Sequence, residues 1–135
     1  MNMFKLDINT FICISLSVPP QPVRLVNTTS SSEHLEGRVE VLYNGTWGTV
    51  CHYSWQKKDA DITCRQLGYI LGFPRGNSHY GRGNVSVITN IHCHGIERNL
   101  LGCYHSGFTS LTYCPTAGVY CSNDTGTFYS TLQMG

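Results

Sequence analysis

The sequence has few charged residues and no concentration of charge of one sign. Charged side chains make up 13% of the 135 residues, half of the roughly 25% that is usual in soluble domains. The formal net charge is +1, and the longest run of basic residues is the pair Lys57 and Lys58. Because nucleic-acid binding requires a concentrated basic surface, this composition excludes that class of protein. It also provides no strong attraction to an anionic membrane.

Several catalytic and metal-binding motifs are missing as well. No C-x-x-C pair occurs, although most zinc ribbons, zinc fingers and thiol redox motifs need one. Neither G-x-S-x-G nor H-E-x-x-H is present, and residues 81–83 (GRG) lack the Lys-Ser/Thr and the helix start of a phosphate loop. Nothing in the sequence indicates an enzyme.

No apolar run is long enough to span a bilayer, which takes roughly 20 residues. The longest, residues 8–18, is interrupted by polar side chains, follows Lys5 and ends at Pro19 and Pro20. A short apolar segment after a basic residue is typical of a secretory signal. We therefore expect residues 1–22 to be a signal peptide or leader, with a linker from a longer parent chain as the alternative.

Cysteine, by contrast, is abundant. The seven cysteines lie at positions 13, 51, 64, 93, 103, 114 and 121. Removal of the expected leader would take away Cys13 and leave six at wide spacings, which is typical of a disulfide framework in an oxidising compartment. Four N-x-S/T sequons, at Asn27, Asn44, Asn84 and Asn123, independently favour an extracellular glycoprotein.

Residue periodicity predicts a small, mostly β domain with one main helix. Short strands are expected at residues 23–26, 38–43 and 46–51, the last two joined by a tight turn at Asn44-Gly45. Helical spacing predicts a helix over residues 57–67, ended by Gly68. Residues 27–34 and 68–83 are expected to be loops, residues 85–93 and 117–121 further strands, and residues 123–135 a linker or truncated tail.

A series of motifs in order resembles the scavenger receptor cysteine-rich (SRCR) family over about residues 23–122. The motifs are GRVEVLYNGTWGTVC (37–51), W-x-x-x-D-A (55–60), CRQLG (64–68), C-x-G-x-E (93–97), HSG (105–107) and AGVYC (117–121). The resemblance implies an α+β fold, in which a curved and mainly antiparallel β-sheet packs on one main α-helix in a small disulfide-rich domain.

The cysteine positions select one form of this family. Leu35 and Tyr69 stand where the eight-cysteine form has a bonded pair, so the sequence resembles the six-cysteine form, group A. That resemblance implies the pairs Cys51–Cys114, Cys64–Cys121 and Cys93–Cys103. The long Cys51–Cys114 loop would contribute roughly 4 kcal/mol in a chain-entropy model, and the short Cys93–Cys103 loop roughly 3 kcal/mol.

Two sharper interpretations of the cysteines have less support. Cys51 beside His52 is not favoured as a nucleophile and base, because adjacent residues of a strand point to opposite faces. The tripeptide His92-Cys93-His94 suggests a metal clamp, but no further ligands are spaced to complete it.

Many SRCR domains bind calcium or magnesium through a cluster of acidic residues, because hard cations prefer carboxylate oxygens. Here the corresponding positions hold His52, Tyr53, Gln56, Thr89 and Asn90, and Glu97 alone is retained, with Asp59 nearby in sequence. We expect no cofactor, and Glu97 and Asp59 are the only weak candidates for a calcium site.

The sequence therefore predicts a secreted or ectodomain module that binds an extracellular protein or a polyanionic or glycan ligand, as scavenger and innate-immune receptors do. Candidate contacts are the Tyr, Arg and His residues of one stretch: Arg75, His79, Tyr80 and Arg82. Two alternatives remain open. One is a structural or adhesion module of a larger receptor or matrix protein, and the other is an accessory domain of a secreted multidomain protease or oxidase.

The disulfide hypothesis makes a prediction about thiols. Alkylation of the secreted, unreduced protein should label none of the six cysteines from Cys51 to Cys121, because all six would be oxidised. Peptide mass spectrometry checks this, and labelling of any one of them would contradict the framework.

Overall fold

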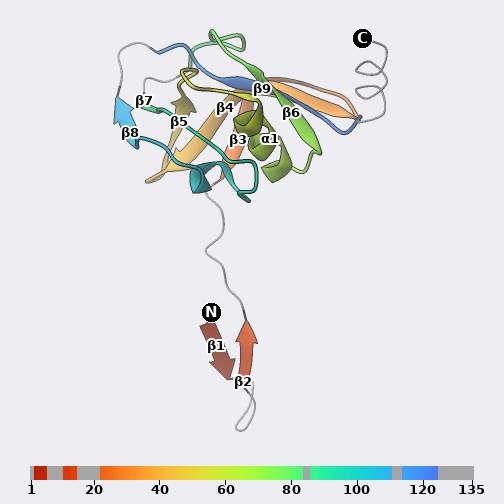
Figure 1. Cartoon of the computed structure of the whole chain (residues 1–135), viewed down its shortest axis with the longest axis vertical. Coiled ribbons are helices and arrows are strands. Elements are labelled where there is room, and N and C mark those ends of the chain that lie inside the picture. The colour runs from red at the N-terminus through yellow and green to blue at the C-terminus, as the bar shows by residue number, and fades with distance from the viewer. Residues whose placement is uncertain (1, 6–10, 15–21, 84–85, 111–113, 125–135) are drawn as a thin grey trace.

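The computed structural model describes residues 2–5, 11–14, 22–83, 86–110 and 114–124. Its main body is a seven-stranded sheet with the order β6-β9-β4-β5-β7-β8, in which β3 also pairs with β4 (Figure 1). Every pairing in this sheet is antiparallel except that of β5 with β7. The strands are β3 (Val23–Ser30), β4 (His34–Tyr43), β5 (Thr46–Val50), β6 (Leu71–Arg75), β7 (Ser86–Ile88), β8 (Phe108–Ser110) and β9 (Gly118–Ser122).

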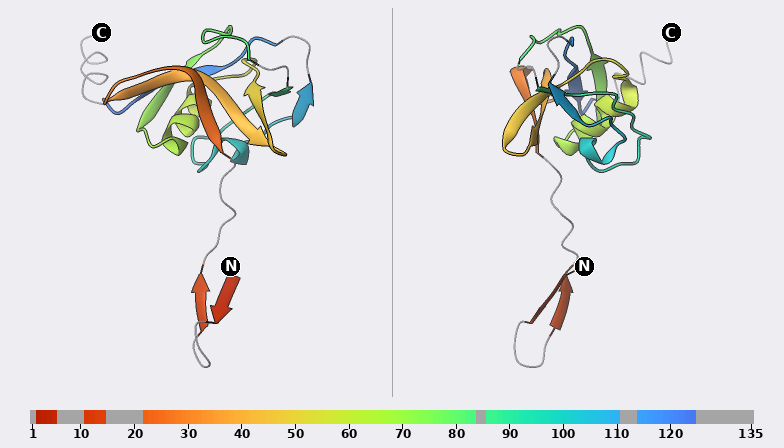
Figure 2. Two further views of the ribbon diagram at one scale, coloured as in Figure 1. Left: turned by 180° about the vertical axis from the view of Figure 1, so that it is seen from behind. Right: turned by 90° about the vertical axis from the view of Figure 1, so that its left-hand side faces the viewer.

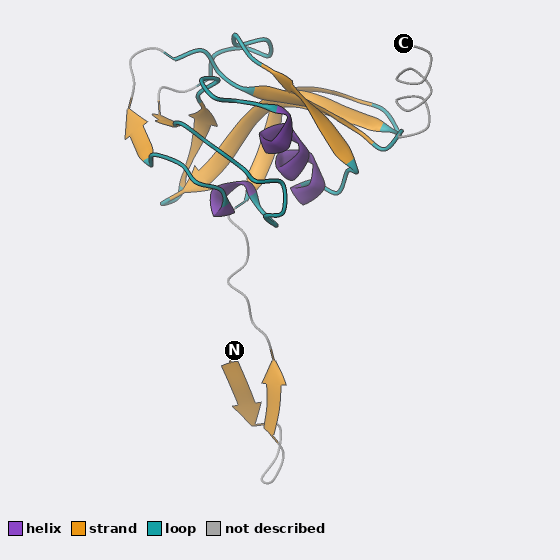
Figure 3. Ribbon diagram, in the orientation of Figure 1, coloured by secondary structure: helices purple, strands orange, loops and turns teal. Residues whose placement is uncertain are grey.

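Two helical segments accompany the sheet, α1 (Lys57–Gln66) and the short 3-10 helix η1 (Leu100–Gly102) (Figure 3). The long strands β3 and β4 bend as they pass across the domain (Figure 2). The expected α+β class, with a mainly antiparallel sheet and one main helix, is confirmed. A separate two-stranded sheet, β1 (Asn2–Lys5) with β2 (Phe11–Ile14), falls within the expected leader.

The hairpin between β4 and β5 follows from its turn residues. Tyr43 pairs with Thr46, and the two residues between them, Asn44 and Gly45, both have positive φ, 49° and 78°. This is the backbone conformation that Asn-Gly favours in a two-residue turn.

Helix α1 begins and ends as its sequence predicts. The backbone N–H of Gln56 donates to Asp59 Oδ2 at 2.7 Å, which satisfies a donor at the start of the helix. At the other end Gly68 adopts a φ of +94°, and the Tyr69 N–H donates back to the Cys64 carbonyl at 2.9 Å.

Two predicted loops are partly strand. Strand β3 continues through an irregularity between Val26 and Thr29 as far as Ser30, so the expected loop over residues 27–34 shrinks to the turn at residues 31–33. Strand β6 lies inside the expected loop 68–83. Its sequence, LGFPR, contains Gly72 and Pro74 and lacks alternation. Pro74 is tolerated because β6 is at the sheet edge and pairs with β9 alone.

The core lies between α1 and one face of the sheet. It consists of buried aliphatic side chains and the Cys64 and Cys121 sulfurs, together with Trp55, whose Nε1–H donates to the Gly118 carbonyl at 2.9 Å. The largest aliphatic members are Val39, Val41, Val50, Ile62, Ile88, Ile91, Leu100 and Val119.

Three disulfides join segments that are distant in sequence. Cys64–Cys121 links α1 to β9, and Cys51–Cys114 links the end of β5 to the segment before β9. Cys93–Cys103 closes a loop with a sequence separation of 10. These are the pairs that the family resemblance implies, and each restricts the unfolded chain.

The close approach of α1 to β6 requires a glycine. A Cβ placed on Gly72 would lie 2.4 Å from Cys64 Sγ and 2.6 Å from the Ala60 carbonyl oxygen, so either the helix or the strand would have to shift.

We therefore expect Gly72→Ala to lower the free energy of unfolding by roughly 1–3 kcal/mol or more. Gly102→Ala is the matched control, because its nearest neighbour, Asn99 Oδ1, would lie 3.4 Å from the new Cβ. Denaturant unfolding of both variants checks this, and equal stabilities would show that Gly72 is not needed for the helix to approach the strand.

Candidate ligand-binding surface

Residues 76–83, here called the covering loop, carry three of the four predicted ligand-contact residues. The loop is fixed to the domain by its backbone. The Asn77 N–H donates to His52 Nδ1 at 2.9 Å, and the Ser78 N–H donates to the Thr116 carbonyl at 3.0 Å. Thr116 donates two hydrogen bonds to the loop. Its N–H donates to Ser78 Oγ at 2.9 Å, and its Oγ1 donates to the Gly81 carbonyl. These bonds fix the backbone from which the exposed side chains of the loop project.

Tyr80 anchors the covering loop to the outer face of the sheet, the face opposite the core. A Cβ on Gly118 would lie 2.4 Å from Tyr80 Cδ2, so the ring packs directly on β9. Its hydroxyl donates to Glu36 Oε1 at 3.1 Å. Its carbonyl accepts from Arg38 Nη1 at 3.0 Å and from Asn27 Nδ2 at 2.7 Å. The structure thus places Tyr80 as a packing residue beneath the surface to which sequence analysis assigned it.

Beneath the covering loop, β4 carries charged side chains on its outer face. Alternation of apolar and polar residues along the strand predicts that this face is exposed to solvent. Arg38 is 7% exposed and Glu40 is 3% exposed. Glu40 accepts from Arg38 at 3.0 Å and from Arg24 at 2.7 Å. Burial of a charge without opposite charges beside it is costly, and here each charge is paired. The strand predicted at residues 38–43 is therefore covered on both faces over residues 38–41.

Arg75, His79 and Arg82 are the exposed members of the predicted set, and we call them the loop surface. Arg75 ends β6, with its Cζ 6.0 Å from the Tyr120 ring centroid. His79 meets the Tyr80 ring edge-on, at a centroid distance of 4.7 Å. The loop surface therefore presents two guanidinium groups and an imidazole on a braced backbone, a composition enriched in protein interfaces.

Glu97 and Asp59, the weak candidates for a calcium site, both bind backbone N–H groups. The Glu97 carboxylate accepts from the N–H groups of His94, Gly95 and Ile96 at 2.8–3.1 Å. These bonds, that of His94 foremost, lower the pKa of Glu97 to about 2. Asp59 is buried and accepts from the N–H groups of Gln56 and Cys93, and burial raises its pKa despite these bonds. Both carboxylates serve the local fold.

The neighbouring positions of the family's cation cluster are also used in other ways. His52 Nδ1 accepts the Asn77 N–H, and Asn90 Nδ2 donates to Ser106 Oγ at 3.0 Å. Cys93 and Cys103 approach Glu97, but their sulfurs form a disulfide and cannot act as thiolate ligands. His92 and His94 are exposed on either side of Cys93.

The asparagines of three of the four sequons lie within the described residues. Asn44 is exposed at a hairpin turn, and Asn123 is exposed while its Oδ1 accepts the Ile70 N–H at 3.1 Å. Asn27 is exposed, but its Nδ2 already donates to the Tyr80 carbonyl. Asn84 lies outside the described residues. Glycosylation at these positions stays a prediction.

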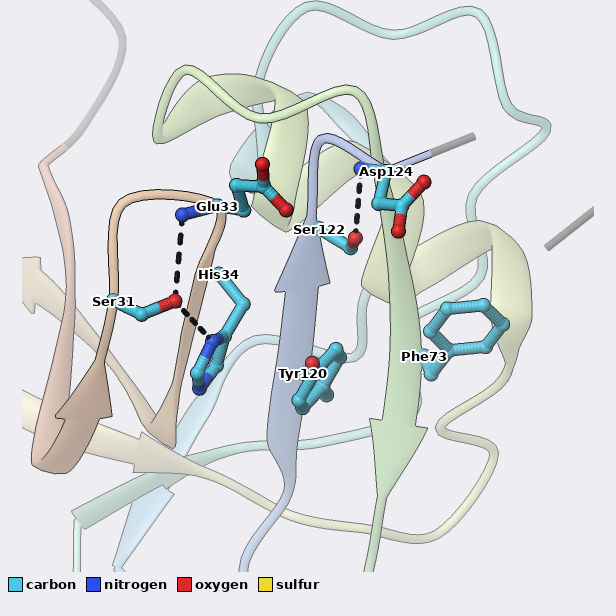
Figure 4. Close-up of a pocket in the computed structure, with 7 residues that line it drawn as sticks. All are labelled: Ser31, Glu33, His34, Phe73, Tyr120, Ser122 and Asp124. Carbon is cyan, nitrogen blue, oxygen red and sulfur yellow. Dashed lines mark hydrogen bonds between the residues drawn. The ribbon is translucent and has the colours of Figure 1, made fainter. Parts of the chain in front are cut away.

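A hollow of about 270 Å³ lies at the end of the sheet where β4 begins. Figure 4 shows the rings of His34, Tyr120 and Phe73 across three adjacent strands, with Glu33 and Asp124 near the strand ends. The His34 and Tyr120 rings stack at 5.0 Å with an interplanar angle of 10°. Sequence analysis missed this site, because its residues come together only when β4, β9 and β6 pair.

One feature of the hollow resembles a hydrolase. Ser31 Oγ lies 2.6 Å from His34 Nδ1, and His34 Nε2 lies 3.5 Å from Glu36 Oε2. A triad also needs donors aimed at a developing oxyanion. The nearby Glu33 N–H instead approaches Ser31 Oγ itself, at 3.4 Å. The geometry therefore favours binding over acyl transfer.

Comparison with known proteins identifies the fold family. The model of the scavenger receptor cysteine-rich domain matches residues 29–122. The chain belongs to the SRCR family. Its fold is similar to the SRCR domain of mouse MARCO, with a TM-score of 0.60 and 34% identity over 70% of this chain and 93% of that one. It is also similar to the third SRCR domain of murine neurotrypsin, with a TM-score of 0.62 and 35% identity over 75% and 95%.

Curated relatives are much longer than this chain. Lysyl oxidase homolog 2 of Gallus gallus is 38% identical over 109 residues, which cover 78% of this chain and 14% of the relative. Galectin-3-binding protein of Mesocricetus auratus is 40% identical over 109 residues, which cover 77% and 18%. The similarity therefore concerns one module of each relative. Within the described residues, no helix has the length and apolar character needed to cross a membrane.

The position of Tyr80 leads us to expect that the stability of the fold depends on pH above 10. Burial, and then the hydrogen bond to Glu36, raise the pKa of Tyr80 to about 12. Because the folded pKa exceeds the ordinary value near 10, the protonated phenol stabilises the fold fully below pH 10, and this contribution is lost as pH rises toward 12.

Tyr80→Phe should therefore cost roughly 1 kcal/mol at pH 8, and the difference from the native chain should shrink above pH 10. The variant should also lack the last step of the tyrosinate absorbance titration. Unfolding curves at several pH values measure the first effect. If the step near pH 12 persists in the variant, it belongs to another tyrosine and the assignment to Tyr80 is wrong.

Proposed function

We propose that this chain is an extracellular ligand-binding module that contacts an acidic protein or glycan through the loop surface of Arg75, His79 and Arg82. The observation that carries the proposal is the fixed backbone beneath these exposed side chains: Arg75 ends strand β6, and the covering loop that carries His79 and Arg82 bonds through its backbone to His52, Thr116 and Arg38. A preorganised surface loses less entropy on binding than a flexible one.

Membership of the SRCR family supports an extracellular setting, because these domains occur in secreted or extracellular proteins. Three disulfides support the same setting, since such bonds persist in oxidising compartments. SRCR domains are generally non-catalytic modules, and a binding role agrees with the hydrogen bonding around Ser31.

A second candidate function is that of an accessory module in a larger secreted protein. This candidate is favoured by the small share of each relative that the chain matches. That share is 14% of lysyl oxidase homolog 2 and 18% of galectin-3-binding protein. In that setting the loop surface would position a partner or a neighbouring domain. Both candidate functions include binding. A longer transcript that encodes further domains beside this module would favour the accessory role.

The loop surface is tested with a double variant, Arg75→Ala with Arg82→Ala. Removal of two exposed cations should weaken binding to an immobilised sulfated polysaccharide by about 5-fold or more, because several charge-assisted contacts are lost. Lys58→Ala with Arg98→Ala, which also removes two exposed cations, is the control and should bind normally. Surface plasmon resonance measures both. Equal loss in the control would mean that overall charge, and not this surface, drives binding.

We further propose that binding does not need calcium. Glu97 and Asp59 are engaged by backbone N–H groups, and one or two carboxylates are too few for a tight calcium site. Addition of 2 mM calcium, or of EDTA, should leave both the thermal midpoint and polysaccharide binding unchanged within error, as checked by calorimetry. A saturable heat of calcium binding would contradict this part of the proposal.

A further inference from the structure

Asn27, one of the four sequon asparagines, lies beside the loop surface. Its Nδ2 donates to the Tyr80 carbonyl at 2.7 Å, and a Cβ placed on Gly81 would lie 3.0 Å from the same nitrogen. His79 precedes Tyr80 and Arg82 follows Gly81, so Asn27 meets the covering loop between two members of the loop surface. We infer that an N-linked glycan on Asn27 covers this surface and limits the access of acidic ligands to it. The inference concerns the regulation of the proposed binding site and rests on the proposed function.

An irregularity in β3 presents Asn27 to the covering loop. The pairing of β3 with β4 shifts its register between Val26 and Thr29, and Asn27 has a φ of 56°. This left-handed conformation is uncommon outside glycine, asparagine and aspartate. The residue that the bulge favours is therefore also the acceptor of the sequon, and it is exposed.

There is room for a sugar beside the amide nitrogen. Outside residues 80–82, Asn27 Nδ2 and Arg38 Nη1 are the only described atoms within 4 Å of the position that a Cβ on Gly81 would occupy. In N-glycosylation, Nδ2 loses one proton and bonds C1 of a sugar, which leaves its lipid diphosphate carrier, so one N–H remains. That N–H can still donate to the Tyr80 carbonyl, which also accepts from Arg38 at 3.0 Å. The covering loop would therefore stay fixed beneath the glycan.

The sequon at Asn44 provides a contrast within the same chain. Asn44 lies in the turn after β4, roughly 20 Å of extended chain from Arg38. A glycan at Asn44 should therefore leave the loop surface open. The two sequons end in comparable residues, because Thr29 in β3 and Thr46 in β5 are both exposed strand threonines.

The experiment expresses the full chain in a eukaryotic secretory cell line and compares Thr29→Val with Thr46→Val. Each variant removes one sequon and keeps its asparagine, so the bond from Asn27 to Tyr80 is retained. Peptide mass spectrometry measures occupancy, and we expect a glycan on Asn27 of the native chain. Thr29→Val should bind the immobilised sulfated polysaccharide about 5-fold more tightly than the native chain, because its cations become accessible. Thr46→Val should bind like the native chain.

A second readout does not depend on the polysaccharide. Diethyl pyrocarbonate modifies exposed imidazoles, and a bulky glycan should slow its reaction with His79, which should react about 3-fold faster in Thr29→Val. His94, exposed in the loop that Cys93–Cys103 closes, should react at the same rate in both chains. If no form of the chain binds the polysaccharide while this labelling difference is present, the proposed function fails and the shielding by the glycan stands.

Enzymatic removal of the glycans from the native chain repeats both measurements without a substitution in β3, and it should give the same increases. Three results would overturn the inference. One is a secreted chain without a glycan on Asn27, and another is an equal effect of Thr29→Val and Thr46→Val on binding. The third is a rate of His79 labelling that neither Thr29→Val nor removal of the glycans changes.

Discussion

Glu40 is buried on the sheet face that alternation along β4 would leave in water, and its carboxylate is paired with Arg24 and Arg38. A buried carboxylate destabilises a fold unless opposite charges and donors surround it. Both guanidinium groups must therefore be paired with Glu40 in the folded domain. Arg38 also donates to the Tyr80 carbonyl. The course of the covering loop is therefore tied to this ion-pair network.

The outer face of the sheet carries both the loop surface and the hollow. Tyr80 packs on Gly118 and covers the middle of the face. Toward the covering loop lie the exposed cations Arg75 and Arg82, and toward the start of β4 lies the hollow with Glu33 and Asp124. On the inner face, α1 and the Cys64–Cys121 bond supply the stability that the rigid loop requires.

Local sequence signals predicted the elements whose cause is local. Asn44-Gly45 predicted the hairpin, and helical spacing followed by Gly68 predicted α1. Strand β6 was missed because only pairing with β9 makes LGFPR extended. The role of Glu97 was missed because a sequence shows a carboxylate but not the N–H groups that bind it. The hollow was missed because strand pairing brings His34, Tyr120 and Phe73 together. Family resemblance supplied the disulfide pairs, which spacing alone leaves open.

Binding through the loop surface depends on the covering loop being fixed to the sheet, and amide hydrogen exchange at Ser78 tests this most directly. Its N–H donates to the Thr116 carbonyl at 3.0 Å, as the Val39 N–H in β4 donates to Ala117 at 3.0 Å. We predict that Ser78 exchanges at least about 100-fold more slowly than an unstructured peptide, because exchange requires the loop to open. Exchange of Ser78 at the unstructured rate while Val39 stays protected would show that the covering loop is not fixed to the sheet.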